Sequence, residues 1–188
     1  MAQSADAIMI AGTGSVYVGP VGSTLPIDPT TALDAALIDL GYLTEDGATL
    51  RDEKTKEPIN AWQSFYPVKY VVTDASAEIE FVLRQWDVVT VPLAFGGGAI
   101  TTTAGPPIVY TYTPPAPEDI DERALVLDWD YDTYNFRLIV PKVMVTSGVD
   151  SQLTRGQASD LPITLGVIGT DGASPYTIVT DHPDWAAA

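Results

Sequence analysis

The stretch ASAEIEFVL, residues 75–83, indicates the fold class, because its apolar and polar side chains alternate with a period of two. One face of such a strand carries Ala77, Ile79, Phe81 and Leu83. The other face carries Glu78, Glu80 and Arg84. An apolar face opposite a charged one predicts a strand half exposed to water. Residues 68–72 alternate in the same way, so we expect an antiparallel hairpin with its turn near Asp74 and Ala75.

The same alternation recurs in residues 125–131 and 134–140, on either side of an expected turn at Asp132 and Thr133. Shorter β-branched or aromatic runs add possible strands at 15–19, 108–113, 161–167 and 176–180. Residues 86–95 fit either a strand or a very short helix, since they combine β-branched residues with a proline. Short strands separated by turns predict a mainly β fold, a β-sandwich or a barrel-like sheet with at most one or two helices.

The chain of 188 residues fits a single domain, 1–188. Residues 42–63 are polar, charged and aperiodic, and we interpret them as a long exposed loop or arm. Residues from about 182 to 188 are expected to form a flexible C-terminal tail. The first 14 residues contain no lysine or arginine, and no apolar run has the length of a membrane span, so we expect neither a secretion signal nor a membrane partner.

The charge is strongly acidic, with 25 acidic and 9 basic residues and a formal net charge of −16. Because 46% of the residues are hydrophobic, the chain has enough apolar material for a core, and the excess acid belongs on the surface. Such a surface repels nucleic acid, whose binding depends on lysine and arginine. The absence of cysteine excludes disulfides, a thiolate nucleophile and a cysteine zinc site.

Asp128, Asp130 and Asp132 resemble the start of a calcium loop. That loop requires glycine at its sixth position and glutamate at its twelfth, where this chain has Thr133 and Ile139. Alternation instead places the three aspartates as an acidic stripe on one sheet face. We therefore expect no metal site.

Catalytic signals are equally weak. The single histidine, His182, would have to serve any serine triad alone, and its position near the end of the chain favours a frayed tail. Glu78 and Glu80 have the composition of a glycosidase acid and base, but alternate carboxylates on an open strand face are usually solvated. The sequence thus favours a protein that is not an enzyme and has no cofactor.

An ordered series of short motifs carries a family resemblance. They are DLGYLTEDGATL (39–50), a charged run (51–57), INAWQ (59–63), VKYVVTD (68–74), EIEFVL (78–83) and VVTVPLAFGG (88–97). In this order and spacing they resemble the major tail proteins of siphophages, particularly those of actinobacterial hosts. The resemblance implies a β-sandwich-like tail tube fold with one short flanking helix at 86–95 and an extended N-terminal arm or loop. It implies no catalytic residue.

The resemblance also implies hexameric rings, made in the host cytoplasm and stacked into the tail tube of the virion. The tube would enclose a tape measure protein, meet tail terminator and distal tail proteins, and later let DNA pass without specific binding. From the residues we predict that the 42–63 arm stacks rings, through Tyr42, Leu43, Ile59 and Trp62. We predict that an acidic stripe lines the channel, either Glu78 with Glu80 or Asp128 with Asp130 and Asp132.

Two other classes remain open from the sequence. A capsid decoration protein, or another virion protein, would share the composition without forming tubes. A β-sandwich carbohydrate-binding module would use its tryptophans to stack on sugar rings.

Overall fold

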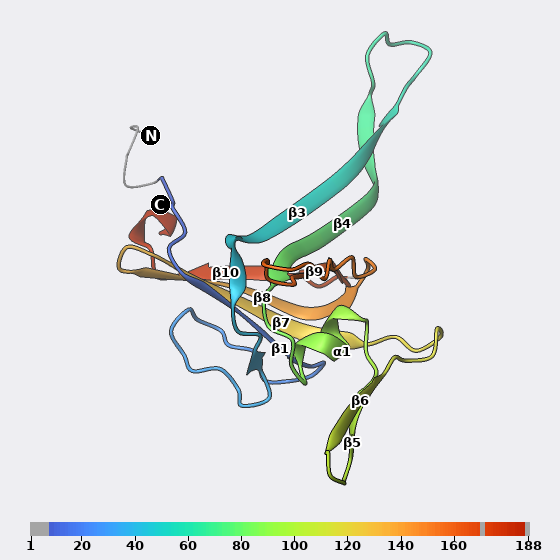
Figure 1. The fold of residues 1–188 in the computed structure, drawn as a ribbon. Coiled ribbons are helices and arrows are strands. Elements are labelled where there is room, and N and C mark those ends of the chain that lie inside the picture. The colour runs from blue at the N-terminus through green and yellow to red at the C-terminus, as the bar shows by residue number, and fades with distance from the viewer. Residues whose placement is uncertain (1–7, 170–171, 187–188) are drawn as a thin grey trace.

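The computed structural model describes residues 8–169 and 172–186, and it is mainly β, as predicted (Figure 1). The strands are β1 (Gly14–Pro20), β2 (Ile38–Asp39), β3 (Leu43–Ile59), β4 (Lys69–Leu83), β5 (Ala99–Thr103), β6 (Val109–Thr113), β7 (Glu122–Tyr131), β8 (Tyr134–Val145), β9 (Leu161–Val167) and β10 (Thr177–Thr180). In this described part of the chain the helical elements are α1 (Thr90–Ala94) and the 3₁₀ turn η2 (Pro183–Trp185). Strand β5 was not among the strands expected from the sequence pattern.

The main sheet is antiparallel, with strand order β2-β1-β7-β8-β9-β4-β3. Strand β8 pairs with β7 along one edge. Along its other edge it pairs with two strands, with β10 in its first half and with β9 at its last residues. The two edge strands are nearly consecutive in the chain, because β2 ends at Asp39 and β3 begins at Leu43. Four residue steps span at most roughly 14 Å, so the two edges of the sheet must come close together. The sheet therefore curls into a sandwich-like or barrel-like shape.

The concave side of this sheet holds the core. Side chains from β1, β4, β7, β8 and β9 pack together there. They include Val16, Val18, Ile79, Phe81, Leu83, Leu125, Leu138, Val140, Ile163 and Leu165. The apolar face predicted for residues 77–83 is thus confirmed, while Glu78 and Glu80 lie on the opposite, half-buried face. Helix α1 adds Leu93 and Ala94 to the same core.

Within residues 86–95 the chain forms a short helix, Thr90–Ala94, and no strand. The Asp87 carboxylate accepts hydrogen bonds from Val89 N at 2.8 Å and from Thr90 N at 2.9 Å. These bonds satisfy two amides that a helix start leaves without partners. Pro92 is tolerated because it lies in the first turn, where no amide is required. The one short flanking helix of the predicted fold is therefore present.

The predicted loop at 42–63 is wrong in its local structure, because most of it is strand β3, paired with β4 over nearly its whole length. The turn expected near Asp74 and Ala75 is also wrong. At that point the register shifts between Thr55 and Lys56, which indicates a β-bulge, and the chain reverses instead between Ile59 and Lys69. A bulge interrupts the period of two much as a turn does, so the sequence pattern did not distinguish them.

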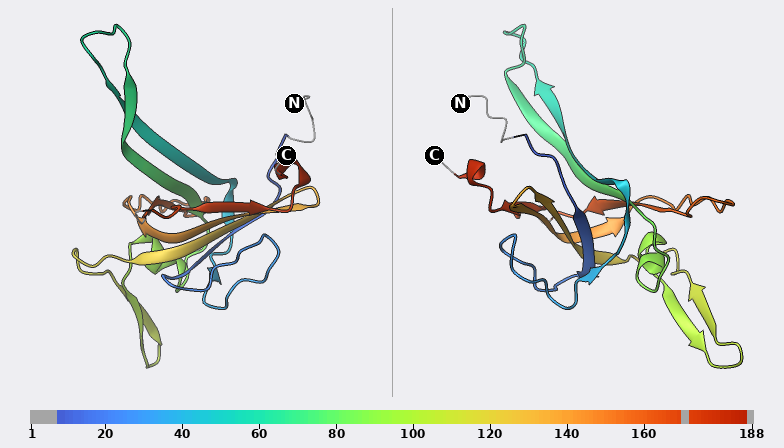
Figure 2. Two further views of the ribbon diagram at one scale, coloured as in Figure 1. Left: turned by 180° about the vertical axis from the view of Figure 1, so that it is seen from behind. Right: turned by 60° about the vertical axis from the view of Figure 1, so that its left-hand side comes forward.

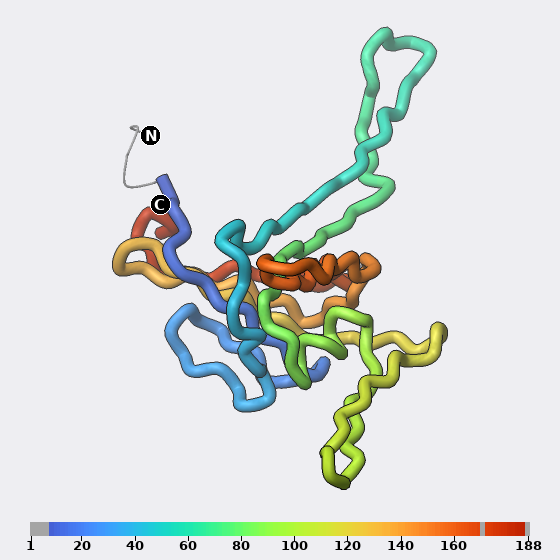
Figure 3. The backbone as a smooth tube through the Cα atoms, viewed as in Figure 1, coloured from blue at the N-terminus to red at the C-terminus, as the bar shows by residue number. Residues whose placement is uncertain are grey.

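Two hairpins project from the body. The outer half of β3–β4, from Arg51 to Ser76, has no buried residue, and Figures 1 and 2 show it extending to one side of the body. The β5–β6 hairpin forms a separate two-stranded sheet and extends to the other side. The path of the backbone in Figure 3 shows both departures clearly. We refer to residues 51–76 as the distal hairpin.

The expected flexible tail includes residues 187 and 188, which lie outside the described part of the chain. For His182 the frayed setting is wrong, because its side chain is only 8% exposed. Its ring lies 4.4 Å from that of Tyr134 and 6.0 Å from that of Phe136. Within the described residues, no helix is both long and apolar enough to cross a membrane.

Candidate functional site

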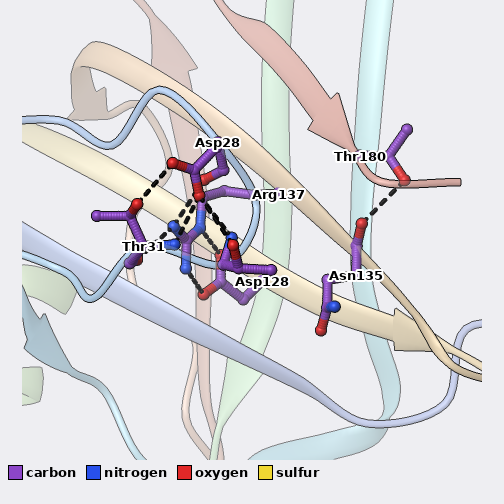
Figure 4. Close-up of polar contacts among 7 residues, drawn as sticks. Asp28, Thr31, Asp128, Asn135, Arg137 and Thr180 are labelled. Atoms are coloured by element: carbon purple, nitrogen blue, oxygen red, sulfur yellow. Dashed lines mark hydrogen bonds and ion pairs between the residues drawn. The ribbon is translucent and has the colours of Figure 1, made fainter.

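The acidic stripe on β7 makes contacts within the chain (Figure 4). Asp128 lies opposite Arg137 of β8, and its two carboxylate oxygens accept hydrogen bonds from Arg137 Nε at 2.6 Å and Nη2 at 2.7 Å. The guanidinium is nearly fully buried, with its side chain 5% exposed. Hydrogen bonding to Asp128 raises the pKa of Arg137 above its ordinary value. Two bonds in this fork geometry make a strong and well-oriented pair.

The buried guanidinium also fastens the proline-rich loop between β1 and β2. Its Nη1 donates to the backbone oxygens of Asp28 and Thr31, each at 2.9 Å. The loop is ordered by its own turn, in which the Asp28 carboxylate accepts from Thr30 N at 2.8 Å and Thr31 N at 2.6 Å. Hydrogen bonds from the Thr31 side chain, and then from the Thr31 and Thr30 amides, lower the pKa of Asp28 to about 2. Asp128 therefore holds a loop to the sheet through Arg137.

Asp130 performs a similar task for the N-terminal segment. Its Oδ1 accepts hydrogen bonds from Thr13 N and Thr13 Oγ1, both at 2.7 Å, and these bonds lower its pKa. Gly12 N donates to the Asp130 backbone oxygen at 2.8 Å. Asp132 is separate from both, since it lies exposed in the β7–β8 turn with a left-handed backbone, φ 54°. In the described residues no group of acidic or histidine side chains is arranged to hold a metal ion.

The face of β4 that carries Glu78 and Glu80 is half-exposed to water. On the neighbouring strand β3, Arg51 lies opposite Glu78 and forms an ion pair with Glu80. Arg51 is 52% exposed, so this pair, unlike that of Arg137, is solvated. A shallow polar hollow on the same face is lined by Arg51, Glu53, Ser76 and Glu78. Three carboxylates thus surround one guanidinium, and the face stays acidic.

The four residues predicted for ring stacking do not lie together. Tyr42 and Leu43 are at the base of the β3–β4 hairpin, where Leu43 packs against the core. Ile59 and Trp62 are at its far end. Strand β3 is 17 residues long, which corresponds to roughly 50 Å of extended strand. Any contact made by the end of the hairpin is therefore independent of its base.

Sequence reasoning missed two residues at this end. Trp62 is 100% exposed, and Phe65 and Tyr66 beside it are also largely exposed. An exposed cluster of large aromatic side chains is typical of a protein–protein contact. The motif SFYP (64–67) directly after AWQ was the available signal, because two aromatic residues in a short turn have no core within reach. We refer to Trp62, Phe65 and Tyr66 as the aromatic tip.

The fold and these surfaces can be compared with known proteins. No curated protein matches the sequence. Among solved structures, a chain from the "Virion of native gene transfer agent (GTA) particle" aligns at 10% sequence identity with a TM-score of 0.43, over 96% of this chain and 100% of that one. A family model described as phage tail tube protein matches residues 1–188. The chain therefore belongs to the phage tail tube protein family, whose members are structural components of the virion tail.

Proposed function

We propose that this chain polymerises into hexameric rings that stack as the tail tube and conduct DNA during ejection. The observation that carries the proposal is the distal hairpin, which extends away from its own body and ends in the aromatic tip. Exposing three large aromatic side chains to water is unfavourable for a monomer. Contact with another copy removes them from water, which gives the hairpin a reason to project.

The contact between rings is then made by the aromatic tip, and the base of the hairpin takes no part in it. Tyr42 and Leu43 keep the hairpin aligned on the body, since Leu43 pairs with Leu83 and packs on the core. Ile59 and Trp62 lie at the contacting end. This division refines the arm predicted from the sequence, with only two of its four residues in the stacking contact.

The channel wall is proposed to be the face that carries Glu78 and Glu80. Asp128 and Asp130 have strong partners inside the chain, whereas on the half-exposed Glu78 face the three carboxylates of Glu53, Glu78 and Glu80 lie around the single guanidinium of Arg51. Repeated around a ring, this face forms an acidic wall that repels phosphates. Repulsion persists over a Debye length of about 8 Å at physiological salt, so DNA does not adhere during transport.

Partners follow from the same proposal. A tape measure protein occupies the channel before DNA does, and tail terminator and distal tail proteins close the two ends. The tube binds no cofactor and catalyses no reaction. DNA passes without a specific contact, as expected for a protein with a net charge of −16.

Negative-stain electron microscopy of the concentrated protein tests the proposal. Salt should promote tubes, because it screens repulsion between acidic subunits. Hydrogen exchange of residues 45–59 should slow on assembly, and Trp62→Ala should raise the protein concentration needed for tube formation several-fold. A matched control is Trp86→Ala, which removes a tryptophan that hydrogen-bonds Ser159 O on the body instead of projecting from it. Protein that stays monomeric at every salt concentration would contradict tube formation.

A further inference from the structure

A charge-free stretch stands out in this acidic chain. No charged residue occurs from Val88 to Pro117, although 18% of all residues are charged. The β5–β6 hairpin lies in the middle of this stretch and projects from the body. We refer to residues 96–116 as the neutral hairpin. Because identical copies with a net charge of −16 repel one another, an uncharged projection is a surface on which two copies can meet without that penalty.

The neutral hairpin has two different faces. The cross-strand pairs Ile100 with Tyr112 and Thr102 with Tyr110 place an aliphatic and two aromatic side chains on one face. The opposite face carries Ala99, Thr101, Thr103, Val109, Thr111 and Thr113. We refer to them as the tyrosine face and the threonine face.

The body of the same chain covers only the base of the tyrosine face. The ring of Tyr112 lies 5.6 Å from that of Phe95, and its hydroxyl donates to Gly97 O at 2.8 Å. Further out, Tyr110 is 70% exposed and Ile108 is also exposed. An isolated two-stranded hairpin is only marginally stable, so the outer part of this one gains stability from a partner.

The edges of this hairpin also lack protection. In the described chain β5 and β6 pair only with each other, so each has a free backbone edge. Proteins usually guard such edges with charged side chains, which discourage contact with other chains. The neutral hairpin has no charged residue at either edge. This composition favours a surface that is covered in the working assembly.

The aromatic tip is a second exposed surface with large apolar side chains on the same chain. Figures 1 and 2 show the two hairpins leaving the body in opposite directions, so they cannot meet within one copy. Two different surfaces on opposite sides of a subunit make a head-to-tail contact, which repeats without limit and builds a filament. We propose that the tyrosine face of the neutral hairpin receives the aromatic tip of the next copy. This inference rests on the proposed tube and identifies the receiving surface of its axial contact.

Cross-linking tests the inference cleanly, because the chain contains no cysteine. Gln63→Cys at the tip combined with Thr102→Cys on the tyrosine face should give a ladder of covalent multimers when assembled tubes are treated with a short bis-maleimide. The matched control combines Gln63→Cys with Thr111→Cys, an exposed threonine on the opposite face of the same hairpin. The control should give little ladder, and the single variant Gln63→Cys none.

The outcomes separate the inference from the proposed function. Tubes that cross-link through Thr102→Cys but not Thr111→Cys support it. Tubes that fail to cross-link, or cross-link equally in both variants, overturn the receiving surface and leave the tube intact as a function. A wild-type chain that forms no tubes overturns the proposed function itself.

A second measurement does not depend on cysteine variants. Trp62→Ala and Tyr110→Ala should each raise the protein concentration needed for assembly several-fold. If the two side chains meet, the double variant should raise it little beyond the larger single effect, because the shared contact is already lost. Effects that multiply in the double variant would show that the two residues act in separate contacts.

Discussion

Two carboxylate–arginine pairs connect neighbouring strands of the main sheet, and they differ mainly in burial. Asp128 and Arg137 join β7 to β8, with the arginine side chain 5% exposed and further bonded to a loop. Glu80 and Arg51 join β4 to β3, with the arginine 52% exposed. Removing Asp128 leaves the buried Arg137 charge without its partner, whereas water can replace either member of the second pair. The same kind of ion pair thus stabilises the subunit where it is buried under a loop, and remains a solvated surface pair where it is exposed.

The sharpest contrast comes from removing one carboxylate from each pair. Asp128→Ala leaves the Arg137 guanidinium buried without its partner and should destabilise the subunit by about 3 kcal/mol. Glu80→Ala should cost less than about 1 kcal/mol, because the exposed pair is screened by water. Thermal or denaturant unfolding of the monomer measures both. Equal losses in the two variants would contradict the distinction drawn from burial.

A double variant tests whether the unpaired charge of Arg137 causes the loss of stability in Asp128→Ala. In Asp128→Ala with Arg137→Met the uncompensated charge is gone, so part of the lost stability should return. The β1–β2 loop should nevertheless exchange its amides faster, because Arg137 no longer bonds the backbone oxygens of Asp28 and Thr31.

The next contrast lies within the aspartate stripe. Asp130→Ala removes both hydrogen bonds that the carboxylate accepts from Thr13, while the backbone bonds from Gly12 N to Asp130 O and from Asp130 N to Thr13 O remain. The variant should therefore loosen the segment around Gly12, with a smaller loss of stability than Asp128→Ala. Limited proteolysis and hydrogen exchange at residues 10–14 would detect this loosening. Asp132→Ala is the matched control, since Asp132 is exposed in the turn and should leave the segment protected. Similar proteolysis of both variants would show that the bonds to Thr13 do not anchor the segment.

The sequence predicted the elements that depend on local patterns and failed for those that depend on contacts between segments distant in the sequence. Alternation identified the core faces of β4, β7 and β8, because a period of two is a local property. It also gave the Asp132–Thr133 turn. It failed at β3, whose polar residues become a strand only because β4 lies beside them. Pairing between distant segments decided that element.

The candidate sites show the same limit. Alternation assigned Asp128 and Glu80 to polar faces, but it contained no information on the Asp28–Thr31 loop that packs over one of them. Residues separated by more than a hundred positions meet there, and no local pattern reports such a contact. Likewise Tyr42 and Trp62 were grouped by proximity in sequence, while an extended strand separates them in space.

Low pH should destabilise the Asp28–Thr31 loop, which packs over the Asp128–Arg137 pair. The pKa of Asp28 is lowered to about 2 by hydrogen bonds from Thr31 and Thr30. Since an unfolded aspartate titrates near 3.9, the stability that these bonds contribute is fully present above about pH 4 and is lost as the pH falls toward 2. An NMR titration of the Asp28 carboxyl should give the low value, and Thr31→Ala should raise it. A pKa near the ordinary value in the wild-type chain would contradict the turn.

The change most relevant to function is expected at Glu78 and Glu80. Both side chains are half-exposed, so Glu78→Lys with Glu80→Lys should keep the fold and the tubes, with a small loss of stability because the lysines lie beside Arg51. If this face lines the channel, however, each ring then presents lysines to passing phosphates. Binding to phosphate releases counterions and strengthens with every added lysine, so DNA should leave assembled particles more slowly, and most slowly at low salt. The control, Glu78→Gln with Glu80→Gln, removes negative charge without adding positive charge and should slow ejection less. Wild-type ejection rates in the lysine variant, with normal tubes by microscopy, would place this face outside the channel and leave Glu80 as a surface partner of Arg51 alone.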